Sequence, residues 1–192
     1  IEAGINSTQI IMMPSGCRVE GGDVIVHNDH LFLGVSNDED VNRYKTARTN
    51  YAGMEYLNNE FRAKEFKGFE LLKDDWNPRG GSLHLDCAFQ PIGRGAVIAP
   101  HLFKHQKDVQ WLKAFFGEEN MYECDAYEAY DLNTNFLSVS PNDIILPASA
   151  TKLDQWLVKQ GYTTHLVNYN EIAKMGGLLR CSTMPLQRAY DE

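Results

Sequence analysis

The sequence lacks the signals of membrane, exported and nucleic-acid-binding proteins. No apolar run approaches the roughly 18 residues that a membrane span needs, and no basic N-terminal region precedes an apolar stretch with a small-residue cleavage site. There is no Lys/Arg-rich run, and the formal net charge is −8. We therefore expect no nucleic acid and no membrane as partners. A cationic small molecule is the ligand that this charge favours.

The cysteines are few and widely spaced, which argues against two further classes. No two of them form a CxxC pair, so neither a zinc ribbon nor a dense disulfide scaffold is indicated. Two histidine pairs have spacings that a metal could use, but neither has a third ligand nearby. We therefore expect no metal, no cofactor and a reducing compartment, the cytoplasm. The residues concerned are Cys17, Cys87, Cys124, Cys181, His27, His30, His101 and His105.

The chain has enough apolar residues to build one domain. Its 192 residues are 43% hydrophobic and 11% aromatic, which permits a substantial core, and we predict a single domain over residues 1–192. The chain opens at Ile1 without a methionine and runs directly into strand-like sequence. We therefore expect that an upstream portion is missing and that the domain is incomplete at its N-terminus. A partner chain could cover an exposed N-terminal edge, which leaves a homo-oligomer open.

The same order of signals occurs three times along the chain. Each pass begins with two apolar runs joined by a turn, which predicts a β-hairpin, and continues with apolar residues at helical spacing. The hairpins are predicted at residues 23–36, 83–100 and 133–149. The helices are predicted at residues 51–66, 109–116 and 153–158. Strand-like segments follow the last two helices, so the repeating unit is strand, strand, helix, strand.

The predicted period has a consequence for the architecture. A repeat of about 50 to 60 residues is typical of propellers and other repeat folds, which need closure or capping at both ends. Three passes therefore need not be the whole ring. The strand-like segments after the second and third helices are residues 121–130 and 162–169. Residues 37–46 are polar and without apolar periodicity, and we interpret them as a surface insertion.

Cys181 has an unusual setting for a core cysteine. It follows a glycine pair and Arg180 and precedes small hydroxyl residues in the segment KMGGLLRCSTMPL. Glycines let a backbone approach a ligand closely, and the charge of Arg180 would favour the nucleophilic thiolate. On composition alone, a buried structural cysteine is the commoner interpretation and a nucleophile is the alternative.

A histidine and a carboxylate lie two residues apart in SLHLDCAF. His84 and Asp86 fall on the predicted first strand of the second hairpin, where alternation would direct both side chains to one face. The imidazole could transfer protons while the carboxylate binds a cation, or the carboxylate could hold the ring in one tautomer. A pair on a solvated strand face is the commoner interpretation of an isolated HxD pattern.

Two acidic residues and an arginine complete the candidates. Glu20 and Asp23 flank a Gly-Gly turn in VEGGDVIV, which read alone is a turn before a strand. Arg48 in ARTN precedes the first predicted helix and could hold a carboxylate through two hydrogen bonds, although a surface arginine at a helix entry is commoner. Arg43, inside the predicted insertion, is the nearby alternative.

Taken together, these segments resemble the guanidino-group-modifying enzymes, the superfamily of arginine deiminases, dimethylarginine dimethylaminohydrolases and amidinotransferases. The family has, in order, an acidic residue at a GGD turn, an RTN-like arginine, an HxD motif and a C-terminal nucleophilic cysteine. Here these are Glu20, Arg48, His84 with Asp86, and Cys181. The resemblance covers nearly the whole chain. It implies an α/β fold, the pentein-type α/β propeller of five ββαβ modules, of which about three are present.

The resemblance also implies a mechanism. Cys181 would attack the guanidinium carbon as a thiolate, and His84 would protonate the departing nitrogen and then activate water. Glu20 and Asp86 would bind the guanidinium nitrogens, and Arg48 would hold the carboxylate of the amino acid. The predicted catalytic residues are Cys181, His84 and Glu20, and the predicted substrate-binding residues are Asp23, Arg48, Asp86 and Arg180.

Three functions are compatible with these motifs. The first is a hydrolase that acts on arginine or a derivative and leaves a ureido product. The second is an amidinotransferase, which would form the same covalent intermediate and pass the amidino group to an acceptor amine. The third is an inactive arginine-binding fragment, because the resemblance places a further acidic residue in a module upstream of Ile1. The motifs do not separate these alternatives.

Overall fold

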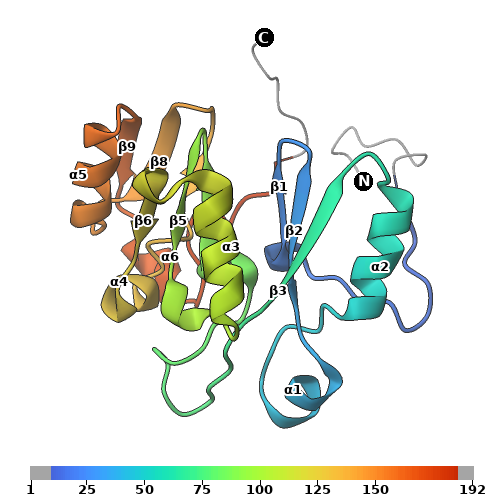
Figure 1. The fold of residues 1–192 in the computed structure, drawn as a ribbon. Helices are drawn as coiled ribbons and strands as arrows, with labels where there is room; N and C mark the ends of the chain where they lie inside the picture. The colour runs from blue at the N-terminus through green and yellow to red at the C-terminus, as the bar shows by residue number, and fades with distance from the viewer. Residues whose placement is uncertain (1–9, 186–192) are drawn as a thin grey trace.

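The computed structural model describes residues 10–185 as three consecutive modules (Figure 1). Each module contains a three-stranded sheet, in which an antiparallel hairpin is joined by a third strand parallel to the second. The strand orders are β1-β2-β3, β4-β5-β6 and β7-β8-β9. A helix precedes the third strand in every module. This confirms the predicted α/β fold with its repeating unit of strand, strand, helix, strand.

The first two modules contain most of the elements. The first comprises the 3-10 turn η2 (Gly21–Asp23), β1 (Val24–His27), β2 (His30–Val35), α1 (Asp38–Arg43), α2 (Tyr51–Glu60) and β3 (Glu65–Glu70). The second comprises η3 (Leu85–Cys87), β4 (Phe89–Ile92), β5 (Gly95–Ile98), η4 (Pro100–Leu102), α3 (Gln106–Phe116), η5 (Glu118–Asn120), β6 (Met121–Glu123) and α4 (Ala126–Tyr130). The third comprises β7 (Leu137–Ser138), β8 (Asp143–Pro147), α5 (Thr151–Lys159), β9 (Thr163–Val167) and α6 (Asn170–Ala173).

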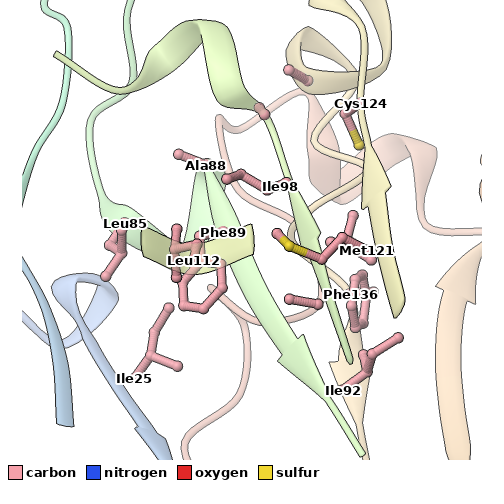
Figure 2. Close-up of a cluster of buried hydrophobic side chains, with 14 of the residues drawn as sticks. Ile25, Leu85, Ala88, Phe89, Ile92, Ile98, Leu112, Met121, Cys124 and Phe136 are labelled. Carbon is pink, nitrogen blue, oxygen red and sulfur yellow. The ribbon is translucent and has the colours of Figure 1, made fainter. Parts of the chain in front are cut away.

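The second module lies between the other two and contains the centre of the core (Figure 1). Every residue of β4 and β5 is buried, because the sheet is covered on both faces and its strands are correspondingly apolar. Ile25 from the first module and Phe136 from the third converge on Phe89 and Ile92 (Figure 2). One hydrophobic cluster therefore joins the three modules and fixes the loops at their ends relative to one another.

The N-terminal segment is attached to the first module beside α2. The Asn50 side chain caps α2 by accepting a hydrogen bond from the Gly53 backbone N–H, and it also accepts one from Arg18 N and donates one to Gly16 O. A Cβ atom at Gly53 would lie 2.3 Å from Arg18 O, so only glycine permits this approach. This contact places the chain that leads into Glu20.

Two predicted elements have different bounds in the structure. The first helix was predicted to reach Phe66 but ends at Glu60, because Phe66 pairs with Leu31 as part of β3. The predicted strand over residues 121–130 ends at Glu123 and gives way to α4, which begins with a capping box. None of the described helices is long and apolar enough to cross a membrane.

The predicted loop-like insertion at residues 37–46 is wrong in its secondary structure. It contains α1, which Asn37 caps by accepting a hydrogen bond from Asp40 N at 2.8 Å. The acidic residues that made the segment look like a loop occupy the first turn of this helix, where carboxylates interact favourably with the helix dipole. The cap and the charge therefore determine the structure here, in the absence of an apolar stripe.

Candidate active site

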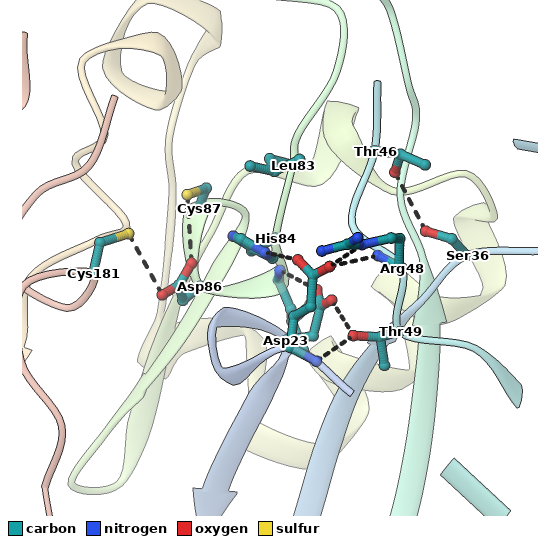
Figure 3. Close-up of polar contacts among 12 residues, drawn as sticks. Asp23, Ser36, Thr46, Arg48, Thr49, Leu83, His84, Asp86, Cys87 and Cys181 are labelled. Carbon is teal, nitrogen blue, oxygen red and sulfur yellow. Dashed lines mark hydrogen bonds and ion pairs between the residues drawn. The ribbon is translucent and has the colours of Figure 1, made fainter. Parts of the chain in front are cut away.

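The candidate residues come from the same position in successive modules. Residues 20–23, 84–87 and 133–135 each lie just before the first strand of a hairpin, and residues 178–181 approach them from the C-terminal side. Figure 3 shows the two chemically distinct ends of the resulting cluster, with Cys181 beside Asp86 and Arg48 beyond His84. The repeat therefore builds the site by bringing equivalent loops together.

The HLD segment is a turn, so the prediction that strand alternation directs its side chains to one face is wrong. Residues Leu85–Cys87 form η3, and the strand begins only at Phe89. The Leu85 backbone N–H donates to Asp23 Oδ1 at 3.0 Å, and the turn closes on itself. As a result, His84 points toward the first module and Asp86 points toward Cys181 (Figure 3).

The His84 imidazole is held against the first module. Its Nε2 atom lies 2.9 Å from Glu20 Oε2, and both side chains are partly exposed. A Cβ atom at Gly22 would lie 2.8 Å from His84 Cγ, so the GGD turn lets the ring pack directly against the backbone. Glu20 Oε1 accepts hydrogen bonds from both Arg48 N and Arg48 Nε, at 3.1 and 3.0 Å. Glu20 thus orients an imidazole and a guanidinium at once.

Asp23 lies beneath this group and supports it. Its side chain is only 2% exposed, and it accepts hydrogen bonds from Thr49 Oγ1 and Leu85 N. Burial raises the pKa of Asp23 to about 6, against the opposing effect of the Thr49 hydrogen bond. Both carboxylate oxygens are therefore used to connect the RTN and HLD segments, and Asp23 holds the loops together.

The sulfur-containing end of the site is more enclosed. Asp86 is 2% exposed, and its oxygens lie 3.4 Å from Cys87 Sγ and 3.8 Å from Cys181 Sγ. The Asn135 amide donates to Cys181 Sγ at 3.2 Å, and its carbonyl accepts from Cys181 N at 3.1 Å. Cys181 itself is an exposed residue, whereas the contacts of its sulfur atom with Asn135 and Asp86 are partly buried.

The surroundings favour a thiolate at Cys181. A hydrogen bond from Cys87 is the largest influence; burial opposes it, and contacts with Leu178, Asn135 and His84 act in the same direction as Cys87. Together they lower the pKa of Cys181 to about 5. Burial, followed by repulsion from Cys181, raises the pKa of Asp86 to about 6. Two acidic groups therefore face each other across a short distance, and no described cation pairs directly with Asp86.

The lower pKa of Glu20 has a different cause. Burial raises this pKa, but hydrogen bonds from His84 and Arg48 outweigh it, and the net shift is downward. Glu20 is therefore ionised at neutral pH because it already has partners. Its partners are both members of the predicted site.

The structure thus brings four of the predicted residues into one cluster, namely Cys181, His84, Glu20 and Asp86. Arg48 joins it through Glu20. The Arg180 guanidinium donates to Val24 O at 3.4 Å, and its charge lowers the pKa of Asp86. Arg43, the alternative to Arg48, lies at the end of α1 with its guanidinium 5.2 Å from the centre of the Tyr44 ring.

Sequence reasoning missed three residues of this cluster. Thr49 follows Arg48 directly, Cys87 follows Asp86, and Asn135 precedes the third hairpin. Aligning the three passes with one another would have pointed to Asn135, because it lies in the loop just before the first strand of its hairpin, as Asp23 and Asp86 do in the first two modules. No signal in the sequence marked Thr49 as the hydrogen-bond donor to a buried carboxylate.

The donor atoms of Asp86, Cys87 and Cys181 lie within 4.8 Å of one another, a spacing that a metal ion could also use. Each of the three side chains already takes part in a hydrogen bond within this cluster. These bonds account for the grouping, and the expectation of a metal-free site stays a prediction.

Comparison by sequence gives one informative relative, and no family model matches the chain. The chain is 28% identical over 185 residues to the Bacillus subtilis (strain 168) protein named "Uncharacterized protein YkgA". The match covers 96% of the chain and 56% of the relative. The chain therefore spans about half the length of this relative.

Comparison by structure is more specific about the fold. The N-terminal domain of ArgZ, described as an arginine dihydrolase from the ornithine–ammonia cycle in cyanobacteria, superposes with a TM-score of 0.75 at 19% identity, over 92% of the chain and 59% of the domain. A Pseudomonas aeruginosa DDAH variant complexed with citrulline superposes with a TM-score of 0.64 at 20% identity, over 86% of the chain and 55% of DDAH. The three modules described here thus have the pentein fold of these guanidino-modifying enzymes and correspond to somewhat more than half of it.

Proposed function

We propose that this chain contains the nucleophile end of a hydrolase site for the guanidino C–N bond of arginine or an arginine derivative. The observation that supports this best is the cluster itself. It joins a cysteine of lowered pKa, a buried carboxylate and an imidazole–carboxylate pair within one group of loops. Proteins with the same fold are described as an arginine dihydrolase and a dimethylarginine dimethylaminohydrolase, and one ArgZ variant is covalently bonded to a reaction intermediate.

The first half of the reaction uses the Cys181 thiolate and an acidic His84. Cys181 Sγ forms a bond to the planar guanidinium carbon, which becomes tetrahedral. The C–N bond then breaks, and the departing nitrogen takes the bonding electron pair and a proton from His84. Ammonia or an alkylamine leaves, and a thiouronium group remains on Cys181. Glu20 stabilises the protonated form of His84 from 2.9 Å.

The second half returns the enzyme to its initial state. A water molecule adds to the thiouronium carbon, and His84 accepts the proton that this water loses. The C–S bond breaks, its electrons return to Cys181 as a thiolate, and the ureido product leaves after the second proton of the added water passes to solvent. His84 therefore acts first as an acid and then as a base, which is compatible with its partial exposure to solvent.

The charges at the sulfur end favour a cationic substrate. Asp86 and Cys181 repel each other when both are ionised, and a guanidinium between them would relieve that repulsion through charge-assisted hydrogen bonds. Arg48 is bound to Glu20 through Nε, and its side chain is 69% exposed. We assign it the carboxylate of the substrate, with Asp23 and Arg180 supporting the loops around it.

Incubation with candidate substrates tests the proposal directly. The full-length protein would be mixed with arginine and methylated arginines, and ureido product, released amine and the intact protein mass would be measured. We expect turnover and a transient covalent adduct in the wild type and in Cys17→Ser, the control at a cysteine outside the cluster. Cys181→Ser should lose both signals. A wild-type protein with neither turnover nor adduct, or full activity in Cys181→Ser, would refute the proposal.

A transferase differs only in what attacks the intermediate. Adding an acceptor amine to the same assay would divert the amidino group from water, so a new guanidino product in place of the ureido product would identify an amidinotransferase. The small-molecule substrate would be the same.

All four cysteines are free thiols, which supports a reducing compartment, and we place the activity in the cytoplasm.

A further inference from the structure

Asn135 is the residue that connects the nucleophile to the rest of the protein. It is completely buried and lies immediately before Phe136, a residue of the core. Cys181, in contrast, lies beyond α6, in a segment that forms neither a helix nor a strand. The backbone of this segment is tied to Asn135 twice, because Arg180 N donates to Asn135 O at 3.2 Å and Cys181 N donates to Asn135 Oδ1 at 3.1 Å.

The other end of the same amide contacts the reacting atom. Asn135 Nδ2 donates to Cys181 Sγ at 3.2 Å and to Asp86 O at 3.2 Å, and it lies 3.8 Å from Cys87 Sγ. A single side chain therefore touches the nucleophile and the turn that carries the second carboxylate. Only a primary amide offers both a carbonyl acceptor and two N–H donors in one plane.

We propose that Asn135 is the positioning residue of the nucleophile, which fixes the Cys181 backbone with its carbonyl and holds the ionised sulfur with its N–H group. This rests on the proposed function, which makes Cys181 the nucleophile. The N–H group cannot lose its proton at the pH values at which enzymes work, so it donates whether Cys181 is a thiol or a thiolate. A hydrogen bond to the charged form favours that form.

Three other groups around Cys181 also influence how readily its thiol ionises. Cys87 makes the largest contribution to the lowered pKa of Cys181, His84 adds a favourable charge, and Asp86 opposes ionisation. Asn135 differs from all three because it carries no titratable proton of its own. Replacing it by alanine therefore removes a fixed donor without adding charge, whereas replacing it by aspartate removes the donor and also adds a negative charge beside the sulfur.

Asn135→Asp is the sharpest variant, because it retains the size and one acceptor oxygen while exchanging the N–H donor for a negative charge. The rate of Cys181 alkylation by iodoacetamide would be measured against pH, with peptide mass spectrometry separating it from the other cysteines. We expect the midpoint to rise by about two pH units, and alkylation at pH 6 to slow about tenfold. Asn142→Asp, the same change on an exposed turn of the third module, should retain the wild-type profile.

Asn135→Ala removes both the donor and the acceptor without adding charge. We expect a smaller rise of the midpoint, of about one pH unit, and a fall in kcat with little change in KM, because the nucleophile is less well placed. A wild-type midpoint in both variants, with far-UV circular dichroism showing that they are folded, would overturn the proposal.

A measurement on the unaltered site covers the case in which both variants unfold. The side-chain amide proton resonances of Asn135 should shift with pH at the midpoint of Cys181 alkylation, and this shift should disappear in Cys181→Ala. Resonances that do not respond to pH would overturn the proposal. The alkylation and resonance measurements need no turnover assay, so the absence of ureido product from arginine would contradict the proposed reaction and leave the role of Asn135 standing.

Discussion

The two ends of the site differ in how their charges are balanced. At the first-module end, Glu20 is a carboxylate with two cationic or proton-bearing neighbours, His84 and Arg48, and its pKa is lowered. At the sulfur end, Asp86 is almost fully buried beside an anionic sulfur, and its pKa is raised to about 6. One end is electrostatically satisfied by the protein, and the other is left with excess negative charge.

This difference indicates that the two carboxylates have different tasks, with Glu20 orienting its neighbours and Asp86 binding a ligand. Glu20 holds its partners in fixed positions, which is the task of a group that prepares an imidazole for proton transfer. Asp86 gains most when a cation arrives, because a buried carboxylate without a directly paired cation is costly. The comparison therefore supports the proposal that a substrate guanidinium binds at the sulfur end. It also predicts that changes at the two ends have effects of different kinds.

Removing the charge of Asp86, at the sulfur end, should have the largest effect on kcat/KM. We expect Asp86→Asn to lower kcat/KM by about 100- to 1000-fold, because the substrate guanidinium loses a charge-assisted hydrogen bond. The same variant should make Cys181 easier to ionise, because repulsion between the two anions is mutual. Turnover would fall while alkylation of Cys181 below pH 5 becomes faster.

The control for this experiment is Asp131→Asn, which removes a charge from an exposed position after α4. It should leave both turnover and alkylation at wild-type values. Slower turnover and slower alkylation together in Asp86→Asn would show that this residue maintains the shape of the site, and would contradict its assignment as a ligand.

The contribution of Asp23, which lies beneath the site, to the free energy of unfolding should depend on pH. Asp23 has a pKa of about 6 in the folded protein against 3.8 for the free group, so the folded state binds its proton more tightly. This contribution is complete below about pH 4 and is lost as the pH rises through 6. The penalty of Asp23→Asn on the free energy of unfolding should therefore be about 2–3 kcal/mol larger at pH 4 than at pH 7.

Urea unfolding of the wild type and Asp23→Asn at the two pH values measures this difference. Glu70 should contribute to stability with the opposite pH dependence. Its hydrogen bonds with Tyr51, Lys104 and Asn37 outweigh burial and lower its pKa to about 2. Its contribution is lost only as the pH falls below about 4, which is the opposite direction. A penalty for Asp23→Asn that is equal at both pH values would mean that Asp23 is ionised throughout this range.

The sequence predicted the repeat and most of the cluster for a physical reason. Hairpins and amphipathic helices follow from local patterns of apolar residues, and the three passes repeat those patterns. The loop before each hairpin therefore lies at a similar place in its module, so Glu20 and His84 could be grouped before their contact was known. The setting of Cys181 made it a candidate, and the resemblance favoured its interpretation as a nucleophile, since its segment has no periodicity of its own.

What the sequence could not predict depends on contacts between distant residues. The HLD segment is apolar enough for a strand, but Asp23 takes the N–H group of Leu85 and makes it a turn. The role of Asn135 depends on a segment 46 residues away along the chain. The bounds of the first helix depend on the pairing of Phe66 with Leu31, which competes with the helical pattern. Such competition is decided by tertiary packing.

Changing Glu20, at the first-module end, should have a moderate effect on turnover and almost none on the alkylation midpoint of Cys181. We expect Glu20→Gln to lower kcat about tenfold to thirtyfold, because the amide orients His84 but no longer stabilises its protonated form. The alkylation midpoint of Cys181 should move by less than about half a pH unit. Glu55→Gln, the same substitution on the exposed face of α2, is the matched control for turnover. A large shift of the Cys181 midpoint would show that the two ends are not electrostatically separate.

The smallest effect should distinguish the two candidate arginines. Within the described residues, the Arg48 side chain hydrogen-bonds only through Nε, so its terminal nitrogens can meet a substrate carboxylate. Arg48→Ala should raise KM about fivefold to tenfold, an effect reduced by exposure of the side chain to solvent, and should change kcat less. Arg43→Ala should leave KM within about twofold of the wild type, since Arg43 stacks on Tyr44 at the far end of α1. A substrate analogue without the carboxylate sharpens the test, because Arg48→Ala should then lose its effect on KM. If the effect persists with that analogue, Arg48 acts through Glu20 and belongs with the orienting groups, and the carboxylate must be bound elsewhere.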